Sequence, residues 1–194
     1  MFVTGTADFQ LLKCNPRVPP RDETTKPTAG AVGIGCFIFR APSGATHMAH
    51  SYVSSVFHIV FSTKQRMQLI RPEHKSRLWN YLAGIGRNHG IQVLAVGGME
   101  NHVHMLVVLR SDMALSDAVR TLKTNSSRWV RETDRLFAWQ QGYGAFSVSP
   151  SQLERVKHYI ANQAHHHRTH SFEQEFLAML QAANIRLETG HVFG

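Results

Sequence analysis

Two histidines that flank a single valine, His102 and His104, are the residues of this chain whose type and spacing most clearly allow chemistry. They open an apolar, strand-like run that continues to Leu109. Side chains i and i+2 of a β-strand point to the same face of a sheet, so both imidazoles should project from one side. Such a pair forms half of a site for a divalent metal ion.

Two further residues, Tyr159 and Gln163, lie one helical turn apart and should share one face of a helix. The amide oxygen of Gln163 could supply a third metal ligand. Tyr159 would then lie beside the metal as a nucleophile. The four residues together define a candidate site for metal-assisted nucleophilic chemistry.

The composition permits one globular domain and favours a polyanionic partner. The chain has 194 residues, of which 43% are hydrophobic, enough for a sizeable core. Its formal charge of +8 and its pI of about 10.0 favour nucleic acid over a small neutral ligand. No membrane partner is expected, because the apolar run of residues 31–39 is too short to span a bilayer. We expect a cytoplasmic, nucleoid-associated protein.

The N-terminal segment differs from the rest of the chain. Residues 1–47 hold both cysteines and most of the prolines, and they lack a convincing apolar period. We predict that this segment is a disordered leader or an extension from a mis-assigned start codon, and that residues 48–194 form the working domain. Since no cysteine follows Met48, this domain has no disulfide and no thiolate zinc site.

The apolar periodicity after Met48 predicts an α+β fold. The expected order is β-α-β-β-α-β, a ferredoxin-like antiparallel sheet, with an added C-terminal helix that bears Tyr159. The predicted strands are residues 52–62, 91–96, 102–109 and 140–148, and the predicted helices are residues 72–89 and 115–131, the tyrosine helix from Pro150 and a final helix from Ser171.

Four segments of the chain resemble a known family in order and spacing. They are residues 53–66 (VSSVFHIVFSTKQR), 102–104 (HVH), 123–129 (KTNSSRW) and 159–163 (YIANQ). Together they resemble the single-tyrosine HUH transposases of the IS two-hundred/six-oh-five group, over about residues 50–185. The His-x-His pair alone is a weak motif, but the downstream tyrosine and glutamine make the pattern specific.

The resemblance implies a function and a set of roles. His102, His104 and Gln163 would bind Mg²⁺ or Mn²⁺, and Tyr159 would attack a phosphodiester of single-stranded DNA. The product would be a 5′-phosphotyrosine and a free 3′-hydroxyl, at the ends of an insertion element. The expected partners are single-stranded or hairpin DNA and a second copy of the chain, because family members are dimers that commonly place the tyrosine helix of one subunit against the histidines of the other.

Physical chemistry agrees with this implication. An unaided phenol has a pKa of about 10 and is a poor nucleophile at neutral pH. A metal ion can polarise the scissile phosphate and lower the cost of forming phenolate nearby. A phosphotyrosine conserves the bond energy, so this chemistry suits cleavage and rejoining better than hydrolysis.

Two other functions stay open at this point. One is a non-catalytic single-strand nucleic-acid-binding domain of ferredoxin-like fold, although no predicted strand has the aromatic pattern that such sheets use to stack bases. The other is a metal-dependent hydrolase that uses His102 and His104, with Tyr159 incidental.

Several basic side chains are candidates for phosphate contacts, although an ordinary solvated surface explains them equally well. Most lie on one face of the helix predicted at residues 115–131, and two follow the first strand. The candidates are Lys64, Arg66, Arg120, Lys123, Arg128 and Arg131.

Other histidines have simpler explanations. His58 alternates within an apolar strand, so we expect a structural sheet histidine rather than a ligand. Residues 165–167 are three consecutive histidines, which point in different directions on a helix and are expected to form a solvated basic end. Of these, His166 shares the face of Tyr159 and is a possible accessory contact to the phosphate or the metal.

Overall fold

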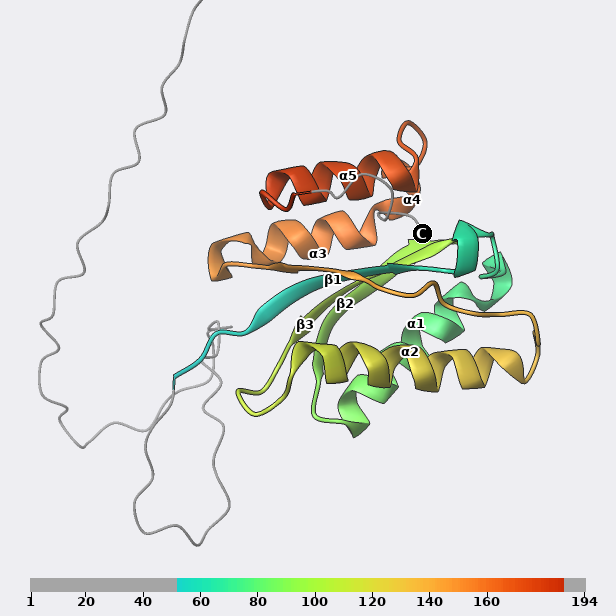
Figure 1. The fold of residues 1–194 in the computed structure, drawn as a ribbon, viewed down its shortest axis with the longest axis horizontal. Coiled ribbons are helices and arrows are strands. Elements are labelled where there is room, and N and C mark those ends of the chain that lie inside the picture. The colour runs from blue at the N-terminus through green and yellow to red at the C-terminus, as the bar shows by residue number, and fades with distance from the viewer. Residues whose placement is uncertain (1–51, 187–194) are drawn as a thin grey trace, which may run out of the picture. The chain divides into compact units, whose positions relative to one another are not determined.

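Four antiparallel strands in the order β2-β3-β1-β4 form the centre of the protein in a computed structural model that describes residues 52–186 (Figure 1). The predicted leader, residues 1–47, lies outside the described residues. The strands are β1 (Val56–Ser62), β2 (Gln92–Met99), β3 (His102–Val108) and β4 (Gly144–Ser147), the helices are α1 (Lys75–Asn88), α2 (Leu115–Arg131), α3 (Leu153–Ala161), α4 (Gln163–His166) and α5 (Phe172–Ala182), and the short 3₁₀ turns are η1 (Lys64–Arg66), η2 (Pro72–His74) and η3 (Pro150–Gln152).

The strand order confirms the predicted ferredoxin-like fold. The two βαβ halves place β1 and β3 at the centre and β2 and β4 at the edges. Helix α2 has the predicted bounds, whereas β1 and β4 are shorter than the strands expected from the sequence. None of the helices in the described part of the chain is long and apolar enough to cross a membrane.

One detail of the tyrosine helix was predicted wrongly. A single helix was expected to carry both Tyr159 and Gln163, but α3 ends before Asn162, whose φ of −100° and ψ of 21° are not helical. The side-chain amide nitrogen of Asn162 donates to the backbone carbonyl of His158, and such local side-chain hydrogen bonds compete with regular helix. Tyr159 and Gln163 therefore lie on two consecutive short helices.

The two faces of the sheet have different chemistry, because the side chains of β3 alternate. Val103, Met105 and Val107 face α1 and α2, where they join the larger apolar core. His102 and His104 face the opposite layer, formed by α3, α4 and α5 (Figure 1). The prediction that both imidazoles share one face is confirmed.

Helix α3 lies unusually close to the edge strand β2. A Cβ atom on Gly97 would lie 2.3 Å from the backbone oxygen of Ile160 and 2.9 Å from its side chain. Gly97 is also the partner of His104 across the β2–β3 ladder. A glycine at this point therefore allows the helix that bears Tyr159 to lie directly against the histidine strand.

We expect Gly97→Ala to lower the free energy of unfolding by about 1–3 kcal/mol, because the added methyl group has to displace the backbone of α3. Gly84→Ala is the matched control, since its Cβ would meet no atom within 4 Å and alanine favours the α1 helix. Urea unfolding of both variants measures the difference. Equal midpoints for Gly97→Ala and the unsubstituted chain would contradict this close packing.

Candidate functional site

His102 and His104 are fully buried, and a hydrogen bond to the Nδ1 atom orients each ring. His102 Nδ1 lies 2.7 Å from the side-chain oxygen of Asn101, so this nitrogen donates and the Nε2 atom keeps its lone pair. His104 Nδ1 lies 2.9 Å from His58 Nε2. His58 is thus a hydrogen-bonded sheet histidine, as expected, and it helps to orient His104.

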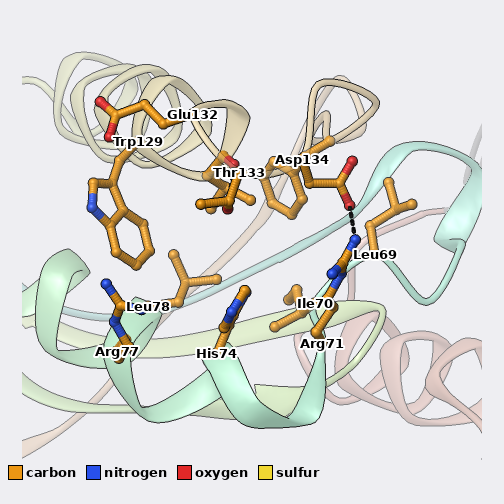
Figure 2. Close-up of a pocket in the computed structure, with 12 residues that line it drawn as sticks. Leu69, Ile70, Arg71, His74, Arg77, Leu78, Trp129, Glu132, Thr133 and Asp134 are labelled. Carbon is orange, nitrogen blue, oxygen red and sulfur yellow. Dashed lines mark hydrogen bonds and ion pairs between the residues drawn. The ribbon is translucent and has the colours of Figure 1, made fainter.

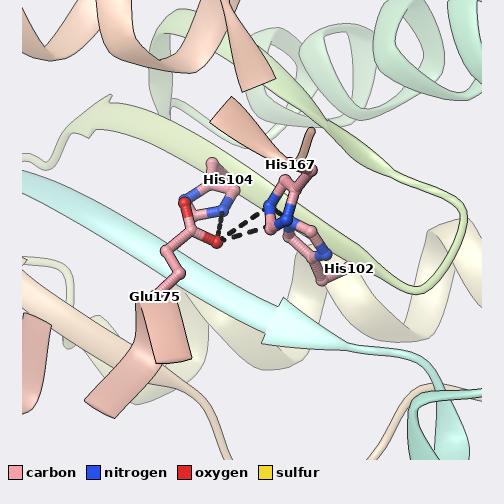
Figure 3. Close-up of side chains that lie close together, drawn as sticks. All are labelled: His102, His104, His167 and Glu175. Carbon is pink, nitrogen blue, oxygen red and sulfur yellow. Dashed lines mark hydrogen bonds and ion pairs between the residues drawn. The ribbon is translucent and has the colours of Figure 1, made fainter. Parts of the chain in front are cut away.

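His167, which directly follows α4, and Glu175 of α5 meet the histidine pair. His167 Nε2 lies 3.1 Å from His102 Nε2, and Glu175 Oε2 lies 3.3 Å from His104 Nε2 and 3.1 Å from His167 Nε2. Figure 3 shows the three rings and the carboxylate converging on one point. One ligand atom from each of His102, His104, His167 and Glu175 lies within 4.8 Å of all the others, a group that we call the His–Glu cluster.

Gln163 joins this cluster although it stands on a separate short helix. Its amide oxygen lies 3.2 Å from His102 Nε2 and 3.0 Å from His167 Nε2, while its amide nitrogen donates to Glu175 Oε1 at 2.9 Å. The bond to Glu175 fixes the amide orientation, so that the oxygen faces the imidazoles. This is the position that the predicted third ligand requires.

Tyr159 contacts the cluster through Glu175. Its hydroxyl donates to Glu175 Oε1, and its ring meets His104 edge-on with the centroids 5.9 Å apart. Burial and the hydrogen bond to the carboxylate raise the pKa of Tyr159 above its usual range. His166 lies beside the same ring, with the centroids 5.3 Å apart, at the edge of the cluster.

Burial keeps the imidazoles of His58 and His102 neutral. Burial, aided by the neighbouring His104, lowers the pKa of His58 and that of His102 to about 3. Burial alone would raise the pKa of Glu175, but the nearby imidazoles of His104 and His167 hold it well below its usual range. The cluster therefore combines an ionised carboxylate with the neutral ring of His102 at neutral pH.

The donor set fits a divalent cation. Among the described residues, His104 Nε2 and Glu175 Oε2 are buried atoms without a hydrogen-bond partner, and they face each other. An unpaired buried polar atom is costly, and a cation between the two would satisfy both. Imidazole nitrogens, a carboxylate oxygen and an amide oxygen are all common ligands of first-row divalent metals.

The sequence interpretation missed two members of the cluster. His167 belongs to the run of three histidines that was expected to be solvated, but its side chain is only 8% exposed, so this expectation was wrong for His167. Glu175 is a buried acid on α5 between Phe172 and Phe176. A charge within the apolar stripe of a helix was the signal that could have revealed it.

The basic residues of α2 do not lie near the cluster, because this helix covers the other face of the sheet (Figure 1). Arg120 is exposed and pairs with Asp117, and Arg128 is also exposed. Lys123 differs from the exposed cation that was expected, because it donates to the carbonyls of Gln140 and Gly142, and burial lowers its pKa to about 8. The Nε of Arg131 donates to the carbonyl of Phe137.

The two basic candidates after β1 lie in the turn η1. Lys64 is exposed, and Arg66 Nε lies 2.9 Å from Glu173 of α5. Arg66 therefore lies near α5, the helix that carries Glu175. It is a predicted phosphate contact that lies on the same side of the sheet as the cluster.

A separate pocket lies on the α1–α2 side of the sheet (Figure 2). The guanidinium of Arg77 lies 5.7 Å from the centroid of the Trp129 ring, and Arg71 pairs with Asp134 at 3.9 Å. Its lining also holds the acidic residues Glu132 and Asp134, and the His–Glu cluster is not part of it. We therefore place the candidate site at the cluster and not in this pocket.

Comparison with known proteins gives consistent matches. Residues 51–163 match the family described as "Transposase IS200 like". The chain is 26% identical over 115 residues to the ISDra2 transposase TnpA of Deinococcus radiodurans, covering 55% of this chain and 82% of that protein. It is also 26% identical over 125 residues to the transposase for insertion sequence element IS200 of Salmonella typhimurium, covering 60% of this chain and 81% of that protein.

Among solved structures, the chain is similar to a REP-associated tyrosine transposase bound to a REP hairpin. The two are 13% identical, the match covers 63% of this chain and 74% of that one, and the TM-score is 0.48. The family assignment rests on the sequence match, which extends over more than half of the 194 residues and includes the His102–His104 pair, Tyr159 and Gln163. The chain belongs to the family of IS200-like transposases.

Proposed function

We propose that this transposase cleaves and rejoins single-stranded DNA through a covalent bond between Tyr159 and a 5′-phosphate, at a site that requires a divalent metal ion. One observation carries the proposal. The Tyr159 side chain, which belongs to the matched segment, lies against His104 of the same chain, with Gln163 beside His102. A nucleophile and a set of metal ligands thus adjoin each other.

Each group of the site has a part in the reaction. The Tyr159 oxygen attacks the phosphorus, the bond to the 3′-oxygen breaks, and that oxygen leaves as a 3′-hydroxyl after taking up a proton. Glu175 Oε1 already accepts the hydrogen bond from the phenol and is its nearest acceptor for the proton. Attack by a 3′-hydroxyl on the phosphotyrosine reverses the step and joins strands without ATP.

The metal ligands in this proposal are His102, His104 and Gln163. A divalent ion held there, Mg²⁺ or Mn²⁺, would polarise the scissile phosphate and stabilise the charge that develops on it. The orienting hydrogen bonds that the Nδ1 atoms of these two rings make with Asn101 and His58 keep the rings fixed for this role.

The other two functions lead to different products. A metal-dependent hydrolase would release cut DNA and never link it to protein, and a non-catalytic binding domain would leave the DNA intact. Incubation with labelled single-stranded DNA and a divalent metal, followed by a denaturing gel, separates the three. A labelled band at the mass of the protein supports strand transfer.

We predict that Tyr159→Phe abolishes this covalent band, because it removes the attacking oxygen and little else. The loss of one hydrogen bond to an ionised carboxylate should lower the free energy of unfolding by about 1.5–3 kcal/mol. Tyr143→Phe is the control, since Tyr143 is exposed in the loop before β4. A covalent band of undiminished strength from Tyr159→Phe would show that another residue is the nucleophile.

The single-chain contact between Tyr159 and His104 leads to a prediction about assembly. In a dimer whose sites are each formed by one chain, a mixture of Tyr159→Phe and His104→Ala subunits has no complete site and should form no adduct. Exchange of tyrosine helices between subunits would instead restore one complete site in every mixed dimer. Co-refolding the two variants and measuring the covalent band, with each variant alone as the control, distinguishes the two arrangements.

We further propose that Lys64, Arg66, Arg120, Lys123, Arg128 and Arg131 contribute to DNA binding, with Arg128 as the most direct test because it is exposed on α2. Arg128→Ala should reduce the slope of log affinity against log salt by roughly 0.7 for single-stranded DNA, whereas Arg128→Lys keeps the charge and the slope. Fluorescence anisotropy over a salt series measures both. Identical slopes for all three proteins would show that Arg128 does not contact DNA and that this face of α2 is ordinary solvated surface.

A further inference from the structure

We propose that His167 and Glu175 are themselves metal ligands, so that the C-terminal helices α4 and α5 complete a site of three imidazoles, one carboxylate and one amide oxygen that selects Mn²⁺ over Mg²⁺. This inference rests on the proposed function, and it adds two ligands that the predicted set of His102, His104 and Gln163 does not contain.

The first argument comes from the direction of the lone pairs. His167 Nδ1 donates to the carbonyl of His170 at 2.8 Å, and His102 Nδ1 donates to Asn101, so both Nε2 atoms present lone pairs in the neutral tautomer. These two atoms lie 3.1 Å apart, and the Gln163 amide oxygen lies within 3.2 Å of both. With both rings in this neutral tautomer, three acceptors face one another with no hydrogen between them, which is the arrangement of ligands around a cation.

The second argument concerns the carboxylate. The Oε2 atom of Glu175 lies 3.1, 3.3 and 3.7 Å from the Nε2 atoms of His167, His104 and His102. An ion pair with a protonated His167 would explain one of these contacts but would leave His104 Nε2 buried without a partner. A cation bound by all four atoms accounts for every contact at once.

Local structure fixes Glu175 in its position. Helix α5 begins with a capping box between Ser171 and Gln174, which sets the first turn of the helix that carries Glu175. The Phe172 ring stacks on the His102 ring with the centroids 4.5 Å apart. Because Glu175 lies one turn after Phe172, the stacked ring directs the carboxylate to the histidines.

The composition of the site predicts its preferred metal. Mg²⁺ favours six oxygen ligands, several of them water, in strict octahedral geometry. Imidazole nitrogens bind first-row transition-metal ions more strongly than they bind Mg²⁺, and Mn²⁺ is the weakest-binding member of that series. Three nitrogens among five ligands should therefore favour Mn²⁺ over Mg²⁺ by at least tenfold.

Direct binding of Mn²⁺ to the full chain, without DNA, tests the inference. The electron paramagnetic resonance signal of free Mn²⁺ gives the Kd, and competition with Mg²⁺ gives the selectivity. We expect Glu175→Gln and His167→Asn each to weaken Mn²⁺ binding at least tenfold. Glu154→Gln and His165→Asn make the same chemical changes at exposed positions and should leave the Kd unchanged.

Two further measurements cover the case in which a variant fails to fold. Glu175→Asp keeps the negative charge but moves the carboxylate away from the imidazoles. Thermal unfolding in the presence of a chelator shows whether each variant is folded. Electron spin-echo measurements on the unsubstituted chain count the imidazoles bound to Mn²⁺ and need no substitution. We expect three imidazoles.

Several results would overturn the inference. A count of two imidazoles, a Mg²⁺ affinity equal to that of Mn²⁺, or unchanged Mn²⁺ binding by folded Glu175→Gln and His167→Asn would each contradict it. If His102→Asn nevertheless lost Mn²⁺ binding and the covalent DNA adduct still depended on metal, the proposed function would stand without these two ligands. Adduct formation in the presence of a chelator would instead contradict the metal requirement of the proposed function.

Discussion

Two imidazoles buried on one face of a central strand require polar partners, and most of the C-terminal structure supplies them. An unpaired buried polar atom costs about 1–3 kcal/mol, so an apolar cover over β3 would destabilise the fold. The layer above His102 and His104 is accordingly polar at its centre, with Gln163, His167 and Glu175 facing inward. The opposite face of the same strand has no such requirement and packs on the apolar sides of α1 and α2.

This requirement explains why α3, α4 and α5 are short and closely seated. A long straight helix from Pro150 could not turn Tyr159 and His167 toward one point, whereas the break at Asn162 changes the direction of the chain between them. Because Gly97 has no side chain, α3 can lie against the sheet edge at Ile160. The geometry of the site is thus set by backbone features at some distance from its reactive atoms.

The sequence predicted the parts of this arrangement that follow from local periodicity. The alternation of β3 placed both imidazoles on one face, the apolar periods gave the strand and helix order, and α2 was predicted at its observed bounds. His167 and Glu175 were not predicted, because their burial depends on how α4 and α5 pack against the sheet. The hydrogen bonds of Lys123 could not be predicted for the same reason, since the carbonyls that accept them belong to a loop distant in sequence.

Glu175 connects Tyr159 to the buried imidazoles, because its two oxygens face different partners. Oε1 accepts hydrogen bonds from Tyr159 and Gln163, while Oε2 faces the imidazoles. Burial raises the pKa of the Tyr159 phenol, and the negative charge of Glu175 raises it further because it disfavours a phenolate beside the carboxylate. Positive charge beside Oε2 would offset that effect. If Tyr159 is the nucleophile that we propose, its readiness to attack should depend on a cation bound at the cluster, even though the phenol itself need not bind the metal.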